Sequence, residues 1–182
     1  MVKKKTCVFI SGQGSNLKNL IYNSRDSNFP IKISLVICNN EKAPGITYAK
    51  KYKIPYILVD SKFKNYENKV LLSLKRYKIT FICLAGYMKI ISSKLIKNYQ
   101  KKIINIHPSL LPKYGGKGMY GLNIHKKVIE NEESETGISI HYVSEEYDSG
   151  KIIFQKKIIV DKYDTPKKLE EKIHKLEYEY FP

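Results

Sequence analysis

Up to residue 107 the chain alternates short apolar runs with segments whose apolar residues recur every three or four positions. The apolar runs predict buried strands over 6–12, 31–39, 54–60, 79–86 and 101–107. The segments between them predict helices over 15–23, 43–52, 65–77 and 92–99, with Pro44 early in the second helix and Ser92 at the start of the last. Continuous apolar strands that alternate with helices are typical of an α/β fold. We therefore expect an open, mostly parallel, twisted sheet with helices on both faces.

The pattern changes after residue 107. A glycine-rich loop over 113–121 leads to a predicted helix over 122–132, and two strand-like runs follow at 136–143 and 151–160. Such closely spaced runs favour an antiparallel pair or an excursion from the main sheet. The last helix is expected over 165–182, with Thr165 as its N-cap and Pro166 in its first position. Because no linker interrupts the chain, we predict a single domain, 1–182.

The chain carries a formal charge of +16, from 33 basic and 17 acidic residues. A basic excess is typical of nucleic-acid-binding proteins. Here nearly all the cations are lysines spread along the chain, and only Arg25 and Arg76 are arginines, the residue that specific readers of nucleic acids use for bidentate contacts. The abundance of Lys, Ile, Asn and Tyr indicates a codon bias toward A and T. We therefore expect small anionic substrates and no nucleic-acid partner.

Several kinds of site are disfavoured. Cys7, Cys38 and Cys83 each lie in an apolar run without C-x-x-C spacing, which predicts buried free thiols in a reducing compartment. The four histidines show no metal-ligand spacing, and no G-x-S-x-G turn of a serine hydrolase is present. No apolar stretch reaches 18 residues and no signal-peptide pattern follows the first lysines. We expect a cytoplasmic protein with no metal and no membrane partner.

The first candidate site is the loop "SGQGSN", residues 11–16, between the first predicted strand and helix. Ligands of open parallel sheets bind at the carboxyl ends of strands, where glycines and a helix N-terminus suit an anion. Leu17 stands where a dinucleotide-binding loop has its third glycine, and no Gly-Lys-Ser/Thr follows, so a single phosphate fits better than a dinucleotide or a triphosphate. The alternative is a tight turn in which Ser15 or Asn16 caps the helix.

The second candidate is the pair Asn105 and His107, at the end of the fifth predicted strand. Residues two apart on a strand point to the same side, and Pro108 ends the strand because proline cannot donate to a sheet. A buried amide or imidazole without a partner costs about 1–3 kcal/mol. The pair at this edge therefore favours a catalytic role over a histidine that only hydrogen-bonds the backbone.

Asp148, in the turn "EEYDSG", is the third candidate. Aspartate before small residues is a common turn former, so a purely structural role is the alternative. A fold that brings residue 148 near His107 would let the carboxylate raise the pKa of the imidazole and set its orientation.

These elements, in this order, resemble a known family. The segments "SGQGSNLKNLI", "LAGYMKII", "NIHPSLLPKYGGKGMYG", "TGISIHYVSEEYDSGKIIFQ" and "HKLEYEYFP" are similar to the phosphoribosylglycinamide formyltransferases of purine biosynthesis, which have a Rossmann-like fold. The resemblance covers nearly the whole chain. "NIHPSLLP" alone is also similar to a segment of methionyl-tRNA formyltransferases and formyltetrahydrofolate deformylases, but those carry an additional domain for which we expect no room here.

The resemblance implies transfer of a formyl group from 10-formyltetrahydrofolate, the cosubstrate, to the glycine amine of 5'-phosphoribosylglycinamide, without a metal. Asn105, His107 and Asp148 would be the catalytic residues. Gly14, Ser15 and Asn16 would hold the phosphate of the ribonucleotide, and Glu177 its ribose hydroxyls, with His174, Lys175 and Leu176 nearby. The folate pocket would be lined, largely through backbone groups, by Met88, Lys89, Ile90, Ile91, Asn105, Ser144, Glu145, Glu146, Tyr147 and Asp148. A folate-facing basic residue is also implied near 62–64.

Two features depart from the family pattern. Lys89 follows "GYM" where the family often has arginine, which weakens the case for a bidentate contact there. The loop at 113–122 matches one variant of the family and is longer than in others. Two alternatives stay open: a formyltetrahydrofolate deformylase without its regulatory domain, and a nucleic-acid-binding module suggested by the charge. A monomer or homodimer is expected.

Overall fold

The computed structural model describes residues 2–60 and 65–182, so the basic residue expected near 62–64 lies outside the described residues. The chain forms two compact units. The first comprises Met1–Ile104 together with Pro182, and the second comprises Asn105–Phe181. Each unit is described separately below.

The first unit is built on parallel strands, as the sequence predicts. Its strands are β1 (Lys4–Ile10), β2 (Ile31–Cys38), β3 (Tyr56–Leu58) and β4 (Phe81–Leu84), and its helices are α1 (Ser15–Asn23), α2 (Ile46–Lys51), α3 (Tyr66–Arg76) and α4 (Ser93–Asn98). β1 pairs with β2 and β4, and β2 pairs with β3, all in parallel. The predicted N-cap is confirmed at Ser92, whose hydroxyl accepts the N–H of Leu95.

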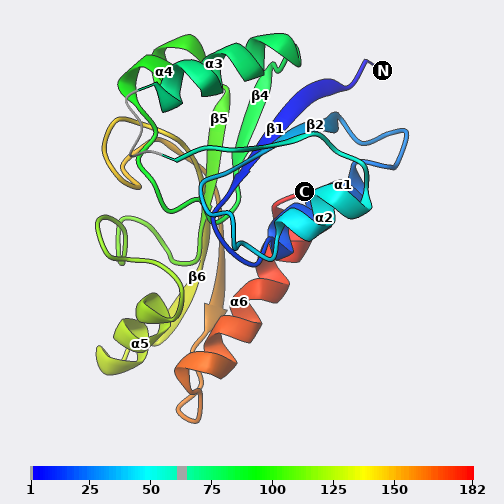
Figure 1. Cartoon of the computed structure of the whole chain (residues 1–182). Coiled ribbons are helices and arrows are strands. Elements are labelled where there is room, and N and C mark those ends of the chain that lie inside the picture. The colour runs from blue at the N-terminus through cyan, green and yellow to red at the C-terminus, as the bar shows by residue number, and fades with distance from the viewer. Residues whose placement is uncertain (1, 61–64) are drawn as a thin grey trace. The chain divides into compact units, whose positions relative to one another are not determined.

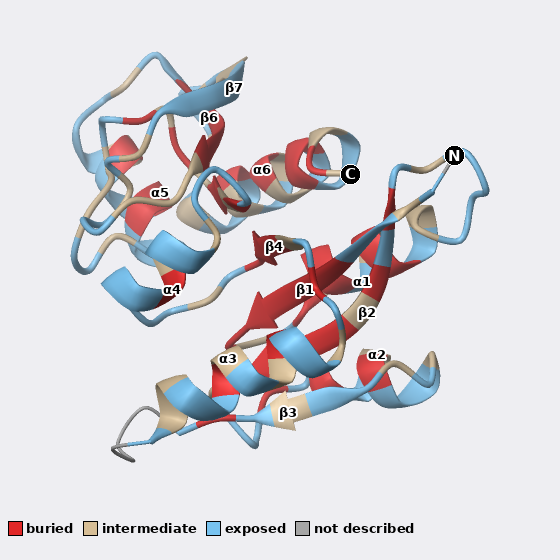
Figure 2. Cartoon of the chain, turned by 90° about the horizontal axis from the view of Figure 1, so that it is seen from above, coloured by how far each residue is buried: buried red, intermediate tan, exposed pale blue. Residues whose placement is uncertain are grey.

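The helices of this unit lie on both faces of its strands. Figure 1 and Figure 2 show α1 and α2 on one side of β1 and β2, and α3 on the other. Crossovers between parallel strands are right-handed, and α1 and α2 carry the chain outward through β2 to β3. The return through α3 to β4, on the far side of β1, therefore places α3 on the opposite face.

Strands β1 and β2 form the centre of the core of the first unit, and Figure 2 shows most of their length buried. The prediction of buried free thiols is confirmed for Cys7, Cys38 and Cys83. Burial raises the pKa of the Cys83 thiol to about 12, and burial also raises the pKa of Cys7. Since the thiolate is the reactive form, these cysteines are inert packing residues.

The second unit combines a hairpin with two helices. It contains α5 (Leu122–Glu130), β6 (Glu135–Tyr142), β7 (Ile152–Ile159) and α6 (Pro166–Tyr180). β6 and β7 pair antiparallel, which confirms the first of the two predicted arrangements. α5 and α6 pack together through the fully buried Ile124, Val128 and Leu169. Thr165 caps α6 by accepting the N–H of Lys168, with Pro166 in the first position, as predicted.

Some predicted boundaries are wrong. The helix expected over 43–52 begins only at Ile46, because Ile46 and Thr47 donate to the carbonyls of Ala43 and Pro44 in a preceding turn. The strand expected over 54–60 has only three residues in strand pairing, β3. The last two helices are shorter than expected and end at Glu130 and Tyr180.

One strand, β5 (Ile103–His107), crosses the boundary between the units. The hydrogen-bonded strand order is β3-β2-β1-β4-β5-β6-β7, an open and mostly parallel sheet, as expected. No helix in the part of the chain that the structure describes is long and apolar enough to span a membrane.

Candidate active site

Asn105, His107 and Asp148 lie together in the second unit, which confirms that the turn at 148 reaches the end of β5. Asp148 Oδ2 lies 3.6 Å from His107 Nδ1, and Asp148 Oδ1 lies 3.4 Å from Asn105 Nδ2. Asn105 and His107 both come from β5, and the alternation of side chains along a strand puts them on one side of it. His107 is only 4% exposed, so the imidazole is screened from bulk water.

The imidazole of His107 has an acceptor at each nitrogen. Nε2 lies 2.7 Å from the carbonyl oxygen of Tyr114, which can only accept, so Nε2 carries a hydrogen and donates it. On the other side, Nδ1 faces the Asp148 carboxylate. A proton added at Nδ1 would therefore find an acceptor already in place.

Burial nevertheless decides the resting charge of His107. Burial lowers the pKa of His107 below its ordinary value of 6.5, and the Asp148 carboxylate and the Tyr114 carbonyl, which raise it, only partly offset this. His107 is thus neutral near pH 7. Asp148 does raise the pKa of His107, as expected, but desolvation lowers it by more.

Asp148 is held as an anion by several donors. Burial raises its pKa, but His141, whose Nε2 lies 3.5 Å from Oδ1, the positive charge that His107 can carry and the N–H of Gly116, 3.0 Å from Oδ2, outweigh this and bring the pKa below its ordinary value of 3.8. Its backbone lies in the left-handed region, φ 51°, which aspartate tolerates better than most residues. A Cβ on Gly115 would lie 3.2 Å from the Asp148 Cβ, so the 115–116 turn fits closely against this side chain.

His141 belongs to the same group, and the sequence analysis did not find it. Its Nδ1 lies 2.9 Å from the Tyr142 carbonyl, so Nδ1 is the donor and Nε2 is left to accept. Nε2 lies 3.1 Å from Asn105 Nδ2 and 3.5 Å from Asp148 Oδ1. The only available signal was its inward position on the predicted strand 136–143, and such positions are usually filled by core residues.

The loop "SGQGSN" lies in the first unit, where β1 leads into α1. Gly14 is the N-cap of α1, with φ 73°, and no side chain caps this helix, so the alternative in which Ser15 or Asn16 is the cap is wrong. A Cβ on Gly14 would lie 2.6 Å from Gly45 Cα, and Gly45 donates its N–H to the Gly12 carbonyl. The first N–H groups of α1 have no acceptor within the helix, which suits an anion.

A polar cluster supports the segment 88–91 at the carboxyl edge of the first unit. The Ser11 hydroxyl accepts the N–H of Met88 at 2.8 Å and donates to Asn39 Oδ1 at 2.5 Å, and Asn40 Nδ2 donates to the Ser11 carbonyl. Met88, Lys89 and Ile90 are exposed, and Ile91 is buried. The sequence analysis did not find this role of Ser11, Asn39 and Asn40, because serine and asparagine after a strand are common turn residues.

The turn before Asp148 is held by its own side chains. The Ser144 hydroxyl lies 2.8 Å from that of Ser149, and both serines donate to the Glu146 carbonyl. Glu145, Glu146 and Tyr147 are exposed.

In the last helix Glu177 is 6% exposed and shares the buried face with Leu176, whereas His174 is half-buried and Lys175 exposed. Among the described residues, no group of three or more His, Cys, Asp or Glu is placed to hold a metal ion.

Comparison with known proteins shows a consistent similarity over the whole chain. The formyl transferase family matches residues 4–182. The chain is 37% identical to the phosphoribosylglycinamide formyltransferase of Bacillus subtilis (strain 168), over 98% of this chain and 91% of that protein. It is 38% identical to the chloroplastic enzyme of the same name from Arabidopsis thaliana, over 96% of this chain and 63% of that longer protein. The crystal structure of phosphoribosylglycinamide formyltransferase from Bacillus halodurans superposes with a TM-score of 0.91 at 33% identity, covering 98% of this chain and 92% of that one.

Proposed function

The chain belongs to the formyl transferase family, and from this premise we propose that it transfers the formyl group of 10-formyltetrahydrofolate to the glycine amine of 5'-phosphoribosylglycinamide. The observation that carries the proposal is the grouping of Asn105, His107 and Asp148, with His107 neutral and Asp148 ionised. The similarity to named transferases over 98% of the chain favours this reaction over the hydrolysis catalysed by a deformylase.

The reaction needs an oxyanion stabilised and a proton moved. The amine attacks the formyl carbon, and the carbonyl oxygen becomes negatively charged in the tetrahedral intermediate. His107 Nε2–H would donate to that oxygen in place of the Tyr114 carbonyl, and Asn105 Nδ2 would donate through the hydrogen now directed at Asp148, the longer of its two contacts. Donors fixed before the reaction stabilise this charge without reorganisation.

The proton balance closes within the site. The attacking amine loses one proton, and the departing folate nitrogen gains one. His107 could accept the first, because the imidazolium would be stabilised at Nδ1 by Asp148, and then return a proton to the folate nitrogen directly or through water. The Asp148 carboxylate itself stays ionised and orients the ring.

The remaining assignments follow from the same proposal. The phosphate of the ribonucleotide would bind Gly14, Ser15 and Asn16 at the start of α1, and its ribose hydroxyls would bind Glu177, beside His174, Lys175 and Leu176. Folate would contact the segments 88–91 and 144–148, chiefly through backbone groups. The single domain, 1–182, the monomeric or dimeric state and the absence of a metal requirement are part of this proposal.

The test is a spectrophotometric assay for tetrahydrofolate release from 10-formyltetrahydrofolate, with and without 5'-phosphoribosylglycinamide. We expect release only with the ribonucleotide. Equal release without it would show the deformylase. Asn105→Ala and His107→Ala should each lower turnover by about 10²–10³-fold or more while the protein stays folded. Wild-type rates in either purified variant would overturn the catalytic assignment.

A further inference from the structure

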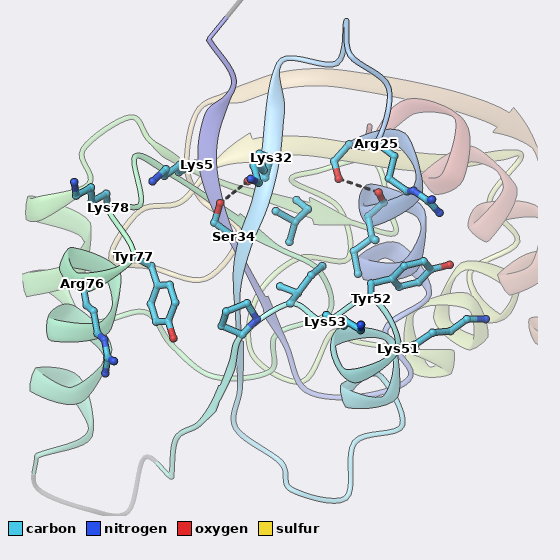
Figure 3. Close-up of a pocket in the computed structure, with 15 residues that line it drawn as sticks. Lys5, Arg25, Lys32, Ser34, Lys51, Tyr52, Lys53, Arg76, Tyr77 and Lys78 are labelled. Carbon is cyan, nitrogen blue, oxygen red and sulfur yellow. Dashed lines mark hydrogen bonds between the residues drawn. The ribbon is translucent and has the colours of Figure 1, made fainter.

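A large cavity lies at the end of the first unit opposite the "SGQGSN" loop. It has a volume of 810 Å³. The residues that line it lie at the beginnings of β1 and β2, just before β3 and β4, and at the carboxyl ends of α1, α2 and α3. Figure 3 shows side chains from these segments around it. Its volume falls within the range of about 300–1,000 Å³ typical of sites for small ligands.

The charge around this cavity is entirely positive. Seven of the fifteen lining residues are basic, and none is Asp or Glu, although the chain as a whole has about one acidic residue for every two basic ones. Both arginines of the chain, Arg25 and Arg76, are among the seven. The others are Lys5, Lys32, Lys51, Lys53 and Lys78.

The negative ends of the helix dipoles can balance only a small part of this positive charge. Three helix carboxyl ends supply a partial charge of about −0.5 each, or about −1.5 in total, against seven cations. The last carbonyls also have other partners. Tyr52 and Ile54 donate to the carbonyls of Tyr48 and Ala49 at the end of α2, and Tyr77 and Ile79 close the end of α3 in the same way. The lysines and arginines are therefore not needed as caps.

The cationic groups themselves have no anionic partner in the part of the chain that the structure describes. None of the seven side chains forms an ion pair or donates a hydrogen bond to another residue within 2–60 and 65–182. Two of the seven side chains lie over aromatic rings, Lys51 over Tyr52 at 5.8 Å and Arg76 over Tyr77 at 5.9 Å. Like charges gathered around one cavity repel one another, and a bound polyanion would remove that repulsion.

We propose that this cavity binds a compact ligand with several adjacent phosphate groups, such as a nucleoside polyphosphate, at a site separate from the catalytic residues. Arg25 and Arg76 would each present a planar fork of donors to one phosphate, and the lysines would neutralise the remaining charge. A single phosphate would leave most of the seven cations without a counter-charge. A cavity bounded by three helix ends fits a small ligand better than a nucleic acid, which needs an extended basic surface.

The experiment is calorimetric titration of the whole protein with inorganic tripolyphosphate at physiological salt. We expect saturable binding at one site. The double variant Arg25→Gln/Arg76→Gln should weaken it by at least about tenfold. The control variant Lys126→Gln/Lys167→Gln removes the same charge from exposed positions of the second unit. It should change the affinity for tripolyphosphate less than twofold. Arg25→Lys/Arg76→Lys keeps the charge and should still weaken binding, because an ammonium lacks the planar fork.

Titration with ATP shows whether the site recognises more than the phosphate chain. Tighter binding of ATP than of tripolyphosphate would identify a nucleoside polyphosphate as the ligand, and equal binding would identify the phosphate chain alone. Both results support the site. Equal weakening in the control variant, or no saturable binding, would overturn it. So would a single-stranded RNA that displaces tripolyphosphate at lower concentration and loses affinity equally in both glutamine variants. Since the readout is binding, a failure of the formyl transfer assay leaves this test unaffected.

Discussion

The side-chain amide of Asn105 donates to Nε2 of His141 over 3.1 Å. This hydrogen bond fixes which end of the amide is the donor, because the His141 Nδ1 hydrogen is already directed at a backbone carbonyl. His141 therefore acts as a positioning residue for Asn105. We expect His141→Ala to lower kcat by about tenfold or more, but by less than the 10²–10³-fold expected for a lost oxyanion donor, with little change in KM.

A double variant separates this role from a general loss of stability. If His141 acts through Asn105, Asn105→Ala/His141→Ala should be no slower than Asn105→Ala alone. His141→Gln keeps an acceptor and should recover part of the rate. Losses of kcat that multiply in the double variant would show that His141 acts independently of Asn105.

The pKa of His107, which Asp148 raises in part, sets the acid limb of the pH profile. The neutral form of His107 is the resting form, and its pKa lies below 6.5, so kcat/KM should stay high down to a pH below 6.5 and then fall. Asp148 raises the pKa of His107, so its removal in Asp148→Asn should move this limb to still lower pH while lowering the maximal rate. The measurement is kcat/KM from pH 4.5 to 8. An acid limb that moves to higher pH would contradict the assignment.

Much of this arrangement could be predicted, because its signals are local. Apolar runs and helical spacing define the parallel strands, and the i and i+2 relation places Asn105 beside His107. His141 and the carbonyl of Tyr114 could not be found in this way. Their contacts depend on where a distant strand and a left-handed turn, φ 57° at Tyr114, bring them relative to β5. The basic cavity likewise joins residues from five separate segments, at 5, 21–25, 32–34, 51–55 and 76–78, and along the chain the lysines indicated only a codon bias.

Gly14 and Gly86 offer a matched test of the phosphate loop. Both have φ 73°, so an alanine at either incurs a similar backbone penalty of about 1–2 kcal/mol. Only Gly14 also meets another backbone, with Gly45 Cα 2.6 Å from the added Cβ, whereas the space at Gly86 is open. Gly14→Ala should therefore lower the free energy of unfolding more than Gly86→Ala does.

The kinetic part of this test concerns the substrate. Because the overlap at Gly14 has to displace the start of α1, we expect KM for phosphoribosylglycinamide to rise by tenfold or more in Gly14→Ala, on the order of the loss of one charge-assisted hydrogen bond. KM for 10-formyltetrahydrofolate should change less. An equal rise in both KM values, or an equal effect of Gly86→Ala, would argue against a phosphate site at this loop.

His125 should make the folded state sensitive to acid. It is 2% exposed, and its Nδ1 has no hydrogen-bond partner among the described residues. Burial, followed by the nearby His174 and His107, lowers its pKa from 6.5 to about 4. Between these pH values the unfolded chain binds a proton that the folded chain does not. The resulting stability is complete above pH 6.5 and is lost as the pH falls toward 4, by about 3 kcal/mol in total.

Urea denaturation of wild type and His125→Leu at pH 7.0 and 4.5 tests this directly. The leucine cannot take up a proton, so the loss of unfolding free energy between the two pH values should be smaller in the variant by about 2 kcal/mol. Lys126→Gln, at the exposed neighbouring position of α5, should lose as much stability as the wild type. If His125→Leu loses the same amount as the wild type, the buried imidazole does not drive acid unfolding, and the carboxylates held by hydrogen bonds, Asp148 among them, would have to account for it.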